Sequence, residues 1–416
     1  MKLTPFEQDI IDVPVYQRLR RIRQLALTDM VYPAANHTRF EHSLGVMHVA
    51  SLMFRQIRAE IERIKPGNAL FSSDDLDKAE AMLRLAALLH DVGHAPFSHA
   101  GEDVMPTIAG QKKRYDHEDY TAALISHFFA DVIKNHPQNV HGISVEELCA
   151  FLGHGNPPRN MLFWRELVKG QMDADRADYL LRDSYHVGVA YGRYDLPRLI
   201  ATLTVAPHPE NEGLVVAVDD GGIQAVESLI IARYMMFTQV YFHHTRRAYD
   251  HHITEVLKYV LQEDSRVRGE QNCTVFRPPA APTREETLEN LRRYVSWTDA
   301  VVWDSIDNGR AGDHGELIRL RRHDRVVART GAVPTPKEVL VLQRDVLPKV
   351  QELGGWLDLA EGAWYKFDRS GVYVTDGKKS VELPDCSAVV KGLEPMFQAR
   401  IYVPLDSEEK AKLMVQ

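Results

Sequence analysis

The feature that most constrains this chain is an apolar helical segment that ends on a histidine, an aspartate and a glycine. Residues 79 to 89 contain no Gly or Pro, and His90-Asp91-Val92-Gly93-His94 follows directly. Neighbouring side chains on a helix point about 100° apart. His90 and Asp91 therefore reach one ion only where the helix ends and the backbone opens. Imidazole and carboxylate suit Zn, Fe, Mn or Mg. A lone His-Asp pair, however, is more often a buried capping histidine beside a solvated aspartate.

Two other stretches favour a metal site over a capping histidine, because they supply a further histidine and further carboxylates. His42 lies in the first turn of an expected long helix that runs to about residue 64. In an expected helix over 171–183, four polar residues share one face at spacings i, i+3, i+4 and i+7: Asp175, Asp178, Tyr179 and Arg182. A polar face is normally a solvent face. The apolar residues of this segment do not form a broad stripe, so we expect the polar face to point inward.

Together these stretches predict a metal site beside groups that transfer protons and bind anions. Two imidazoles and two carboxylates make a four-ligand set: His42, His90, Asp91 and Asp175. Further titratable groups, which a metal cage does not need, suggest proton transfer near neutral pH: His94, His99, Glu102 and His117. Three arginines offer paired donors to phosphate oxygens: Arg39, Arg176 and Arg182. The combination is typical of metal-assisted phosphoester hydrolysis.

Length and local composition predict two lobes in a mainly α-helical chain. At 416 residues the chain exceeds the usual size of a single core. We expect a helical catalytic lobe over residues 1–265 and a smaller mixed α/β lobe over 266–416, separated by a linker rich in proline near residues 278–282. The second lobe carries no metal spacing or phosphate loop, so oligomerisation or a lid is its expected role. Further expected elements are helices over 6–27, 118–133, 145–152, 224–257 and 283–294, a loop over 65–77, and strands over 213–219, 371–374 and 399–403.

Charge and cysteine content argue against a nucleic-acid-binding or membrane-binding protein and against a disulfide-rich one. The net charge of −8 gives no general attraction to nucleic acid or to an anionic membrane. Three widely spaced cysteines do not make a disulfide framework and fit a reducing compartment. The chain begins without an apolar leader, and no run approaches the roughly 18 apolar residues of a membrane span. We expect a cytoplasmic protein that forms a homo-oligomer.

The motif strings resemble those of the HD-domain phosphohydrolases. The fuller set is similar to the deoxynucleoside triphosphate triphosphohydrolases, the branch that includes the sterile-alpha-motif-and-HD-domain protein. The likeness covers roughly residues 8 to 255, and its most specific strings are Tyr16-Gln17-Arg18-Leu19-Arg20, His37-Thr38-Arg39-Phe40-Glu41-His42-Ser43-Leu44-Gly45, His90-Asp91-Val92-Gly93-His94-Ala95-Pro96-Phe97-Ser98-His99, Asp175-Arg176-Ala177-Asp178-Tyr179 and Arg246-Arg247-Ala248-Tyr249.

The resemblance implies a role for each matching residue. His42, His90, Asp91 and Asp175 would bind a divalent ion (Mn, Fe, Zn, Ni or Mg), and Arg39 and Arg176 the triphosphate. His94, His99, Glu102 and His117 would arrange the attacking water and protonate the departing sugar oxygen, with His99 as the expected acid and His117 as the alternative. Attack would fall on the α-phosphorus of a dNTP. The residues expected to contact or crowd the sugar are Gln24, Leu25, Tyr179, Asp183 and Tyr249.

The sequence also departs from the family pattern. Tyr241 and Thr245 stand where a phosphate-contacting Arg and a His appear in the best-known member, so either His243 and His244 compensate or the phosphate contacts differ. Asp12, Gln17 and Arg20 match only part of an activating-nucleotide site, which a preceding segment completes in larger members. Two alternatives stay open: an HD phosphohydrolase of another nucleotide (a monophosphate, a cyclic or a modified nucleotide), or a nucleotide or nucleic-acid sensor with a residual site.

Overall fold

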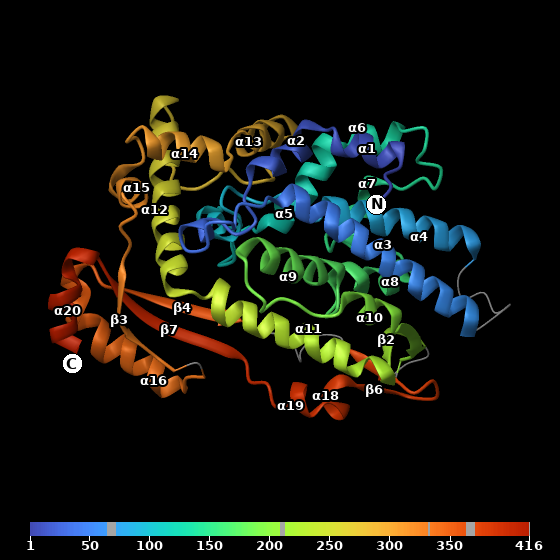
Figure 1. Cartoon of the computed structure of the whole chain (residues 1–416). Helices are drawn as coiled ribbons and strands as arrows, with labels where there is room; N and C mark the ends of the chain where they lie inside the picture. The colour runs from blue at the N-terminus through green and yellow to red at the C-terminus, as the bar shows by residue number, and fades with distance from the viewer. Residues whose placement is uncertain (65–71, 209–212, 332, 363–370, 416) are drawn as a thin grey trace.

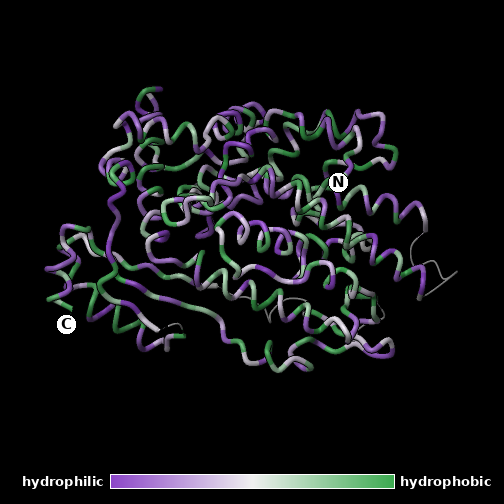
Figure 2. Tube along the Cα trace, in the orientation of Figure 1, coloured by the Kyte–Doolittle hydropathy of each residue, from purple (hydrophilic) through white to green (hydrophobic). Residues whose placement is uncertain are grey.

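A computed structural model describes residues 1–64, 72–208, 213–331, 333–362 and 371–415. The chain is mainly helical, with a smaller mixed α/β region toward the C-terminus, which confirms the expected fold class (Figure 1). Hydrophobic and hydrophilic residues alternate along the helices (Figure 2). Among the described residues, no helix combines the length and apolarity that crossing a bilayer requires.

Helices of the first two hundred residues surround one long central helix. This helix, α3 (Arg39–Ile64), packs against α4 (Ser73–Leu89) and α9 (Ala174–Val187). The close approach of α3 to α9 depends on Gly45, because a Cβ there would lie 2.0 Å from Asp178 Oδ1. Around these three lie α1 (Pro5–Ile11), α2 (Pro14–Gln17), η1 (Arg18–Arg21), η2 (Thr28–Met30), η3 (Ser98–Val104), α5 (His117–Leu124), η4 (Ile125–Phe129), α6 (Ala130–Asn135), α7 (Val145–Phe151), α8 (Arg159–Lys169) and α10 (Leu196–Ala201).

The second half alternates helices with short strands. Its helices are η5 (Asp220–Gly222), α11 (Ile223–Met236), η6 (Phe237–Tyr241), α12 (His244–Val267), α13 (Arg284–Ser296), α14 (Asp299–Asp307), α15 (Gly312–Arg319), α16 (Pro336–Val341), η7 (Leu342–Val346), α17 (Leu347–Val350), η8 (Gln351–Leu353), α18 (Leu383–Cys386), α19 (Ala388–Lys391), η9 (Leu405–Ser407) and α20 (Glu408–Val415). Helix α13 begins after its cap, Thr283, whose hydroxyl accepts from Glu286 N.

Two sheets lie in the described part of the chain. The first has the order β1 (Leu203–Pro207), β2 (Leu214–Asp219), β5 (Tyr373–Thr375), β6 (Ser380–Glu382); β2 and β5 are parallel, and Val218 pairs with Val374. The second is antiparallel, with the order β3 (Arg325–Arg329), β7 (Met396–Val403), β4 (Trp356–Gly362). The first sheet joins strands from both sides of residue 265, and the division into lobes at that residue stays a prediction.

Two of the expected helices are wrong in extent. The helix over 6–27 is divided into α1, α2 and η1, because Pro14 has no N–H to continue α1 and instead begins α2. The helix over 224–257 is interrupted between η6 and α12, where His243 has an extended backbone (ψ 127°). Of the loop expected over 65–77, residues 65–71 lie outside the described residues, while Ser72 caps α4.

Candidate metal centre

The end of α4 presents His90 with one ring nitrogen free. The helix ends at Leu89, and His90 occupies the C-cap position. Its Nδ1–H donates to the Ala87 carbonyl at 2.8 Å, which turns Nε2 toward the interior. Nε2 is buried without a hydrogen-bond partner among the described residues, and Asp91 Oδ1 lies 3.3 Å from it. A buried ring nitrogen held in this way is a ready metal ligand.

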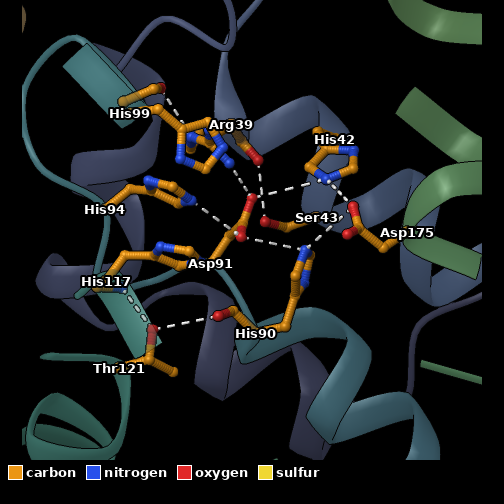
Figure 3. A network of polar contacts seen from close by, with 12 residues as sticks. Arg39, His42, Ser43, His90, Asp91, His94, His99, His117, Thr121 and Asp175 are labelled. Atoms are coloured by element: carbon orange, nitrogen blue, oxygen red, sulfur yellow. Dashed lines mark hydrogen bonds and ion pairs between the residues drawn. The ribbon is translucent and has the colours of Figure 1, made fainter. Parts of the chain in front are cut away.

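His42 and Asp175 complete the same cluster from two other helices. His42 Nε2, on α3, lies 3.0 Å from Asp175 Oδ1 and 3.6 Å from Asp91 Oδ2. Its Nδ1 lies 2.9 Å from Asp178 Oδ2, so a carboxylate orients the ring from behind. His90 Nε2 is 3.8 Å from Asp175 Oδ1. Figure 3 shows the four side chains directed toward one point. The structure thus brings together all four predicted ligands.

The electrostatics of the cluster favour a cation. Burial alone would lower the pKa of His42, but Asp175 and Asp178 outweigh it and raise that pKa to about 10. Burial would raise the pKa of Asp175, yet His42 and His90 hold it below its usual range. Three carboxylates around two imidazoles attract positive charge, and His90 Nε2 has no competing partner. The residues present therefore fit a divalent metal ion.

A second group of titratable residues adjoins the first through Asp91. His94 Nε2 lies 3.3 Å from Asp91 Oδ1, and the His94 ring stacks on His117 with centroids 3.9 Å apart. Glu102 Oε1 lies 2.6 Å from His117 Nδ1 and 3.0 Å from His99 Nδ1. Burial would raise the pKa of Glu102, but His99 and His117 hold it well below its usual range. One carboxylate therefore orients two candidate acids.

The connection that bears these histidines packs closely against α5. A Cβ on Gly93 would lie 2.3 Å from the His117 carbonyl and from Thr121 N, so only glycine fits. Thr121 Oγ1 accepts from Gly93 N at 3.0 Å and donates to the His90 carbonyl at 3.1 Å. The contact fixes His90 relative to His117. Thr121 was not among the predicted site residues.

The two arginines that the resemblance assigns to the triphosphate differ in their surroundings. Arg39 pairs with Asp91 through Nη1, and its Nε donates to Ser98 Oγ at 2.8 Å, so its charge lies beside the metal ligands. Arg176 pairs with Asp173 and the Gly170 carbonyl at the start of its own helix. Arg39 is therefore the cation that the structure places at the ligand cluster.

The residues predicted to contact the sugar occupy two places. Asp183, on α9, accepts from His37 Nε2 at 2.8 Å and from Tyr241 Oη at 2.6 Å, and Tyr179 faces Tyr241 with ring centroids 6.3 Å apart. Tyr249 lies on α12 beside His252 and His323. The role of His37 was missed, although the residue stands inside a recognised string.

The remaining predicted residues lie on the N-terminal segment. Gln24 N donates to the His37 carbonyl at 3.0 Å, which places Gln24 and the buried Leu25 beside the start of α3. Of the residues matched to an activator site, Gln17 and Arg20 are hydrogen-bonded at 2.7 Å, and Asp12 accepts from Gln8 at 3.1 Å. No activator role follows from these contacts alone.

Comparisons with known proteins agree with this geometry. Residues 39–183 match the HD domain, and residues 194–271 match the HD associated region. An uncharacterized protein of Methanocaldococcus jannaschii is 40% identical over 258 residues, which cover 62% of this chain and 47% of that protein. The deoxynucleoside triphosphate triphosphohydrolase SAMHD1 of Gallus gallus is 30% identical over 336 residues, covering 74% of this chain and 50% of that protein. The chain thus spans about half the length of the curated relatives it matches.

A solved structure extends the likeness to the whole fold. The crystal structure of a hypothetical protein from Aquifex aeolicus superposes with a TM-score of 0.76 at 27% identity, covering 100% of this chain and 96% of the other. All four of the predicted ligands lie within residues 39–183, the region that matches the HD domain. The chain belongs to the HD-domain proteins and carries an HD associated region after the HD domain.

Proposed function

We propose that the chain hydrolyses a deoxynucleoside triphosphate to a deoxynucleoside and tripolyphosphate. The observation that carries the proposal is the convergence of His42, His90, Asp91 and Asp175 beside an arginine and a histidine–glutamate group. The relatives named deoxynucleoside triphosphate triphosphohydrolase support the choice of substrate. A divalent metal bound by the four ligands would stabilise the negative charge that develops on the phosphoryl oxygens.

The residues of the chain supply positioning, charge and protons. Arg39, already beside the ligands, offers donors to the substrate's phosphate oxygens. During hydrolysis a water oxygen bonds to the α-phosphorus while the bond from phosphorus to the sugar 5′ oxygen breaks. That oxygen needs a proton as it leaves.

His117 fits the role of proton donor better than His99. Burial would lower the pKa of His117, but the hydrogen bond to Glu102 outweighs it and raises the pKa, so the protonated ring persists to higher pH than in an ordinary histidine. His117 also stacks on His94, which contacts Asp91. The His99 side chain is 65% exposed. We therefore assign His117 as the acid, and His99 as a second partner of Glu102.

Selection of deoxyribose is assigned to Asp183 and the aromatic side chains near it. Both carboxylate oxygens of Asp183 accept hydrogen bonds, from His37 and from Tyr241, so its position is fixed. Tyr179 and Tyr241 narrow the same region and leave less room for a 2′-hydroxyl. Activation by a nucleotide near Asp12, Gln17 and Arg20, and assembly into a homo-oligomer, remain parts of the proposal.

The test is to identify products with and without the ligand set. Wild-type protein incubated with each dNTP and Mn²⁺ should give deoxynucleoside and tripolyphosphate. The His90→Ala/Asp91→Ala variant should lose both bound metal and turnover. His141→Ala, in the connection between α6 and α7, is the matched control and should keep both. Monophosphate or diphosphate products would assign another nucleotide substrate, and nucleotide binding without turnover would favour a sensor.

A further inference from the structure

Three histidines meet between α12 and α15, in a part of the chain that follows the HD ligands in sequence. His251 and His252 belong to α12, and His314 belongs to α15, which packs against it. One ring nitrogen from each lies within 4.8 Å of the other two. The set shares no residue with the HD ligands.

The closest pair of nitrogens faces each other in a way that suits a shared cation. His252 Nδ1 and His314 Nδ1 lie 2.9 Å apart. Without a cation, one ring must carry the proton that joins them, because two unprotonated nitrogens repel each other. A metal ion bound by both nitrogens removes this constraint, since each then offers its lone pair to the ion.

A carboxylate lies near the other nitrogen of His252, just beyond hydrogen-bond distance. His252 Nε2 lies 3.6 Å from Asp324 Oδ1, in a fully buried ring, and has no hydrogen-bond partner among the described residues. Metal-binding histidines usually donate their second N–H to a carboxylate, which fixes the tautomer. Asp324 is itself held, because its Oδ2 accepts from Trp356 Nε1 at 2.7 Å. A proton on Nε2 leaves Nδ1 free as the ligand.

The surroundings also give the rings the right charge and a route for the ion. Burial and the neighbouring histidines lower the pKa of His251 and that of His252, so the surroundings oppose protonation of both rings. The His251 ring stacks on Trp356 with centroids 4.1 Å apart, which restricts its orientation. His314 lines a cavity of about 460 Å³ together with Asp313 and Glu255, so the cluster is reached from solvent.

We propose that His251, His252 and His314 bind a divalent transition metal, with Asp324 as the carboxylate behind His252. Three imidazoles leave a fourth position for water, as in three-histidine zinc sites. The ion would link α12 and α15, and through Asp324 and Trp356 it would tie them to the sheet of β3 and β4. Its role would be structural, because none of these residues is among the HD ligands.

The test counts bound Zn²⁺ in untagged full-length protein after chelation, reloading and dialysis. His314→Gln should remove one Zn²⁺ per chain from the wild type and, separately, from the His90→Ala/Asp91→Ala variant. The matched control is Asp313→Asn, a neighbour in the same cavity, which should keep the wild-type count. Unchanged Zn²⁺ content in His314→Gln, in either background, would overturn the proposal.

A spectroscopic readout separates loss of the site from loss of the fold. With Co²⁺ in the His90→Ala/Asp91→Ala variant, we expect visible absorption typical of nitrogen-ligated Co²⁺, which His314→Gln abolishes while the far-ultraviolet circular dichroism stays unchanged. Zn²⁺ should also raise the melting temperature of that variant, but not after His314→Gln, because only a folded site binds the ion. Co²⁺ absorption that persists in His314→Gln would contradict the assignment.

Discussion

The proposed metal ligands and the segment that holds the connection after them in place are built differently. These four side chains come from α3, the end of α4 and α9, and each of the two histidines lies 3.0 to 3.8 Å from the two carboxylates. The support comes from α13 and α14, far along the chain, and acts on backbone atoms. Tyr294 Oη donates to the Gly93 carbonyl at 2.6 Å, and Asp299 Oδ1 accepts from Phe97 N at 2.8 Å.

Hydrogen bonds from α13 and α14 hold the connection after α4 in a backbone conformation that is unfavourable on its own. Phe97 and Ser98 both have positive φ (58° and 56°), a region that costs a non-glycine residue about 1–3 kcal/mol. Asp299 Oδ2 also accepts from Arg23 N, and Arg18 bridges the Trp297 and His94 carbonyls. The proposed ligands would carry the chemistry, whereas remote residues hold the backbone of the connection that follows them and bears His94.

The largest expected effect comes from the ligand side. Asp91→Asn keeps the shape of the side chain but removes the charge beside His90, His94 and Arg39. We expect loss of bound metal and a fall in kcat/KM of roughly 10³-fold, about 4 kcal/mol. Metal analysis and steady-state kinetics check this, with thermal unfolding as the control. An active, metal-loaded variant would refute the ligand assignment.

The next effect concerns the proton donor and its pH dependence. His117→Ala should lower kcat by about 10²–10⁴-fold while metal is retained. Glu102 raises the pKa of His117, so the protonated form persists to higher pH and activity falls as pH rises through that raised pKa. Glu102→Gln should therefore move the falling limb of the pH–rate profile to lower pH. An unmoved limb would argue against His117 as the acid.

A smaller effect, with a different signature, is expected on the support side. Asp299→Ala leaves the N–H groups of Arg23 and Phe97 without their acceptor, which should cost about 2–4 kcal/mol of folding free energy. The ligands remain, so metal binding should persist while kcat falls by about 10–100-fold. Denaturant unfolding and metal analysis distinguish this from a ligand variant. Metal loss equal to that of Asp91→Asn would remove the distinction between the two regions.

The smallest effect is expected for a single hydroxyl of the support. Tyr294→Phe removes the donor to the Gly93 carbonyl but keeps the ring, which stacks on Tyr120 with centroids 4.0 Å apart. We expect a loss of about 0.5–1.5 kcal/mol in folding free energy and almost unchanged kcat. Calorimetry and kinetics on the same preparation measure both. A large fall in kcat would mean that Tyr294 acts on the reaction more directly.

The sequence predicted the ligand set because metal chemistry demands particular residue types. His42, His90, Asp91 and Asp175 stood out by type and by position at helix ends, and the structure brings them together. Their roles stay predictions. The mainly helical class and the matched HD region were also predicted correctly.

The support and the three-histidine cluster could not be predicted, for a physical reason. Asp299 and Tyr294 act only as a hydrogen-bond acceptor and a donor, which many residue types provide, and their partners lie about two hundred positions away. His314 meets His252 only after α15 packs on α12. The single helix expected over residues 6–27 failed because its apolar spacing outweighed the effect of Pro14 in the prediction.

The most direct test of the central claim follows the oxygen of the attacking water. A dNTP is hydrolysed by the metal-loaded protein in ¹⁸O-labelled water, and the products are analysed by mass spectrometry. Attack at the α-phosphorus predicts one ¹⁸O in the tripolyphosphate and none in the deoxynucleoside. Label in the deoxynucleoside, or products other than these two, would contradict the account.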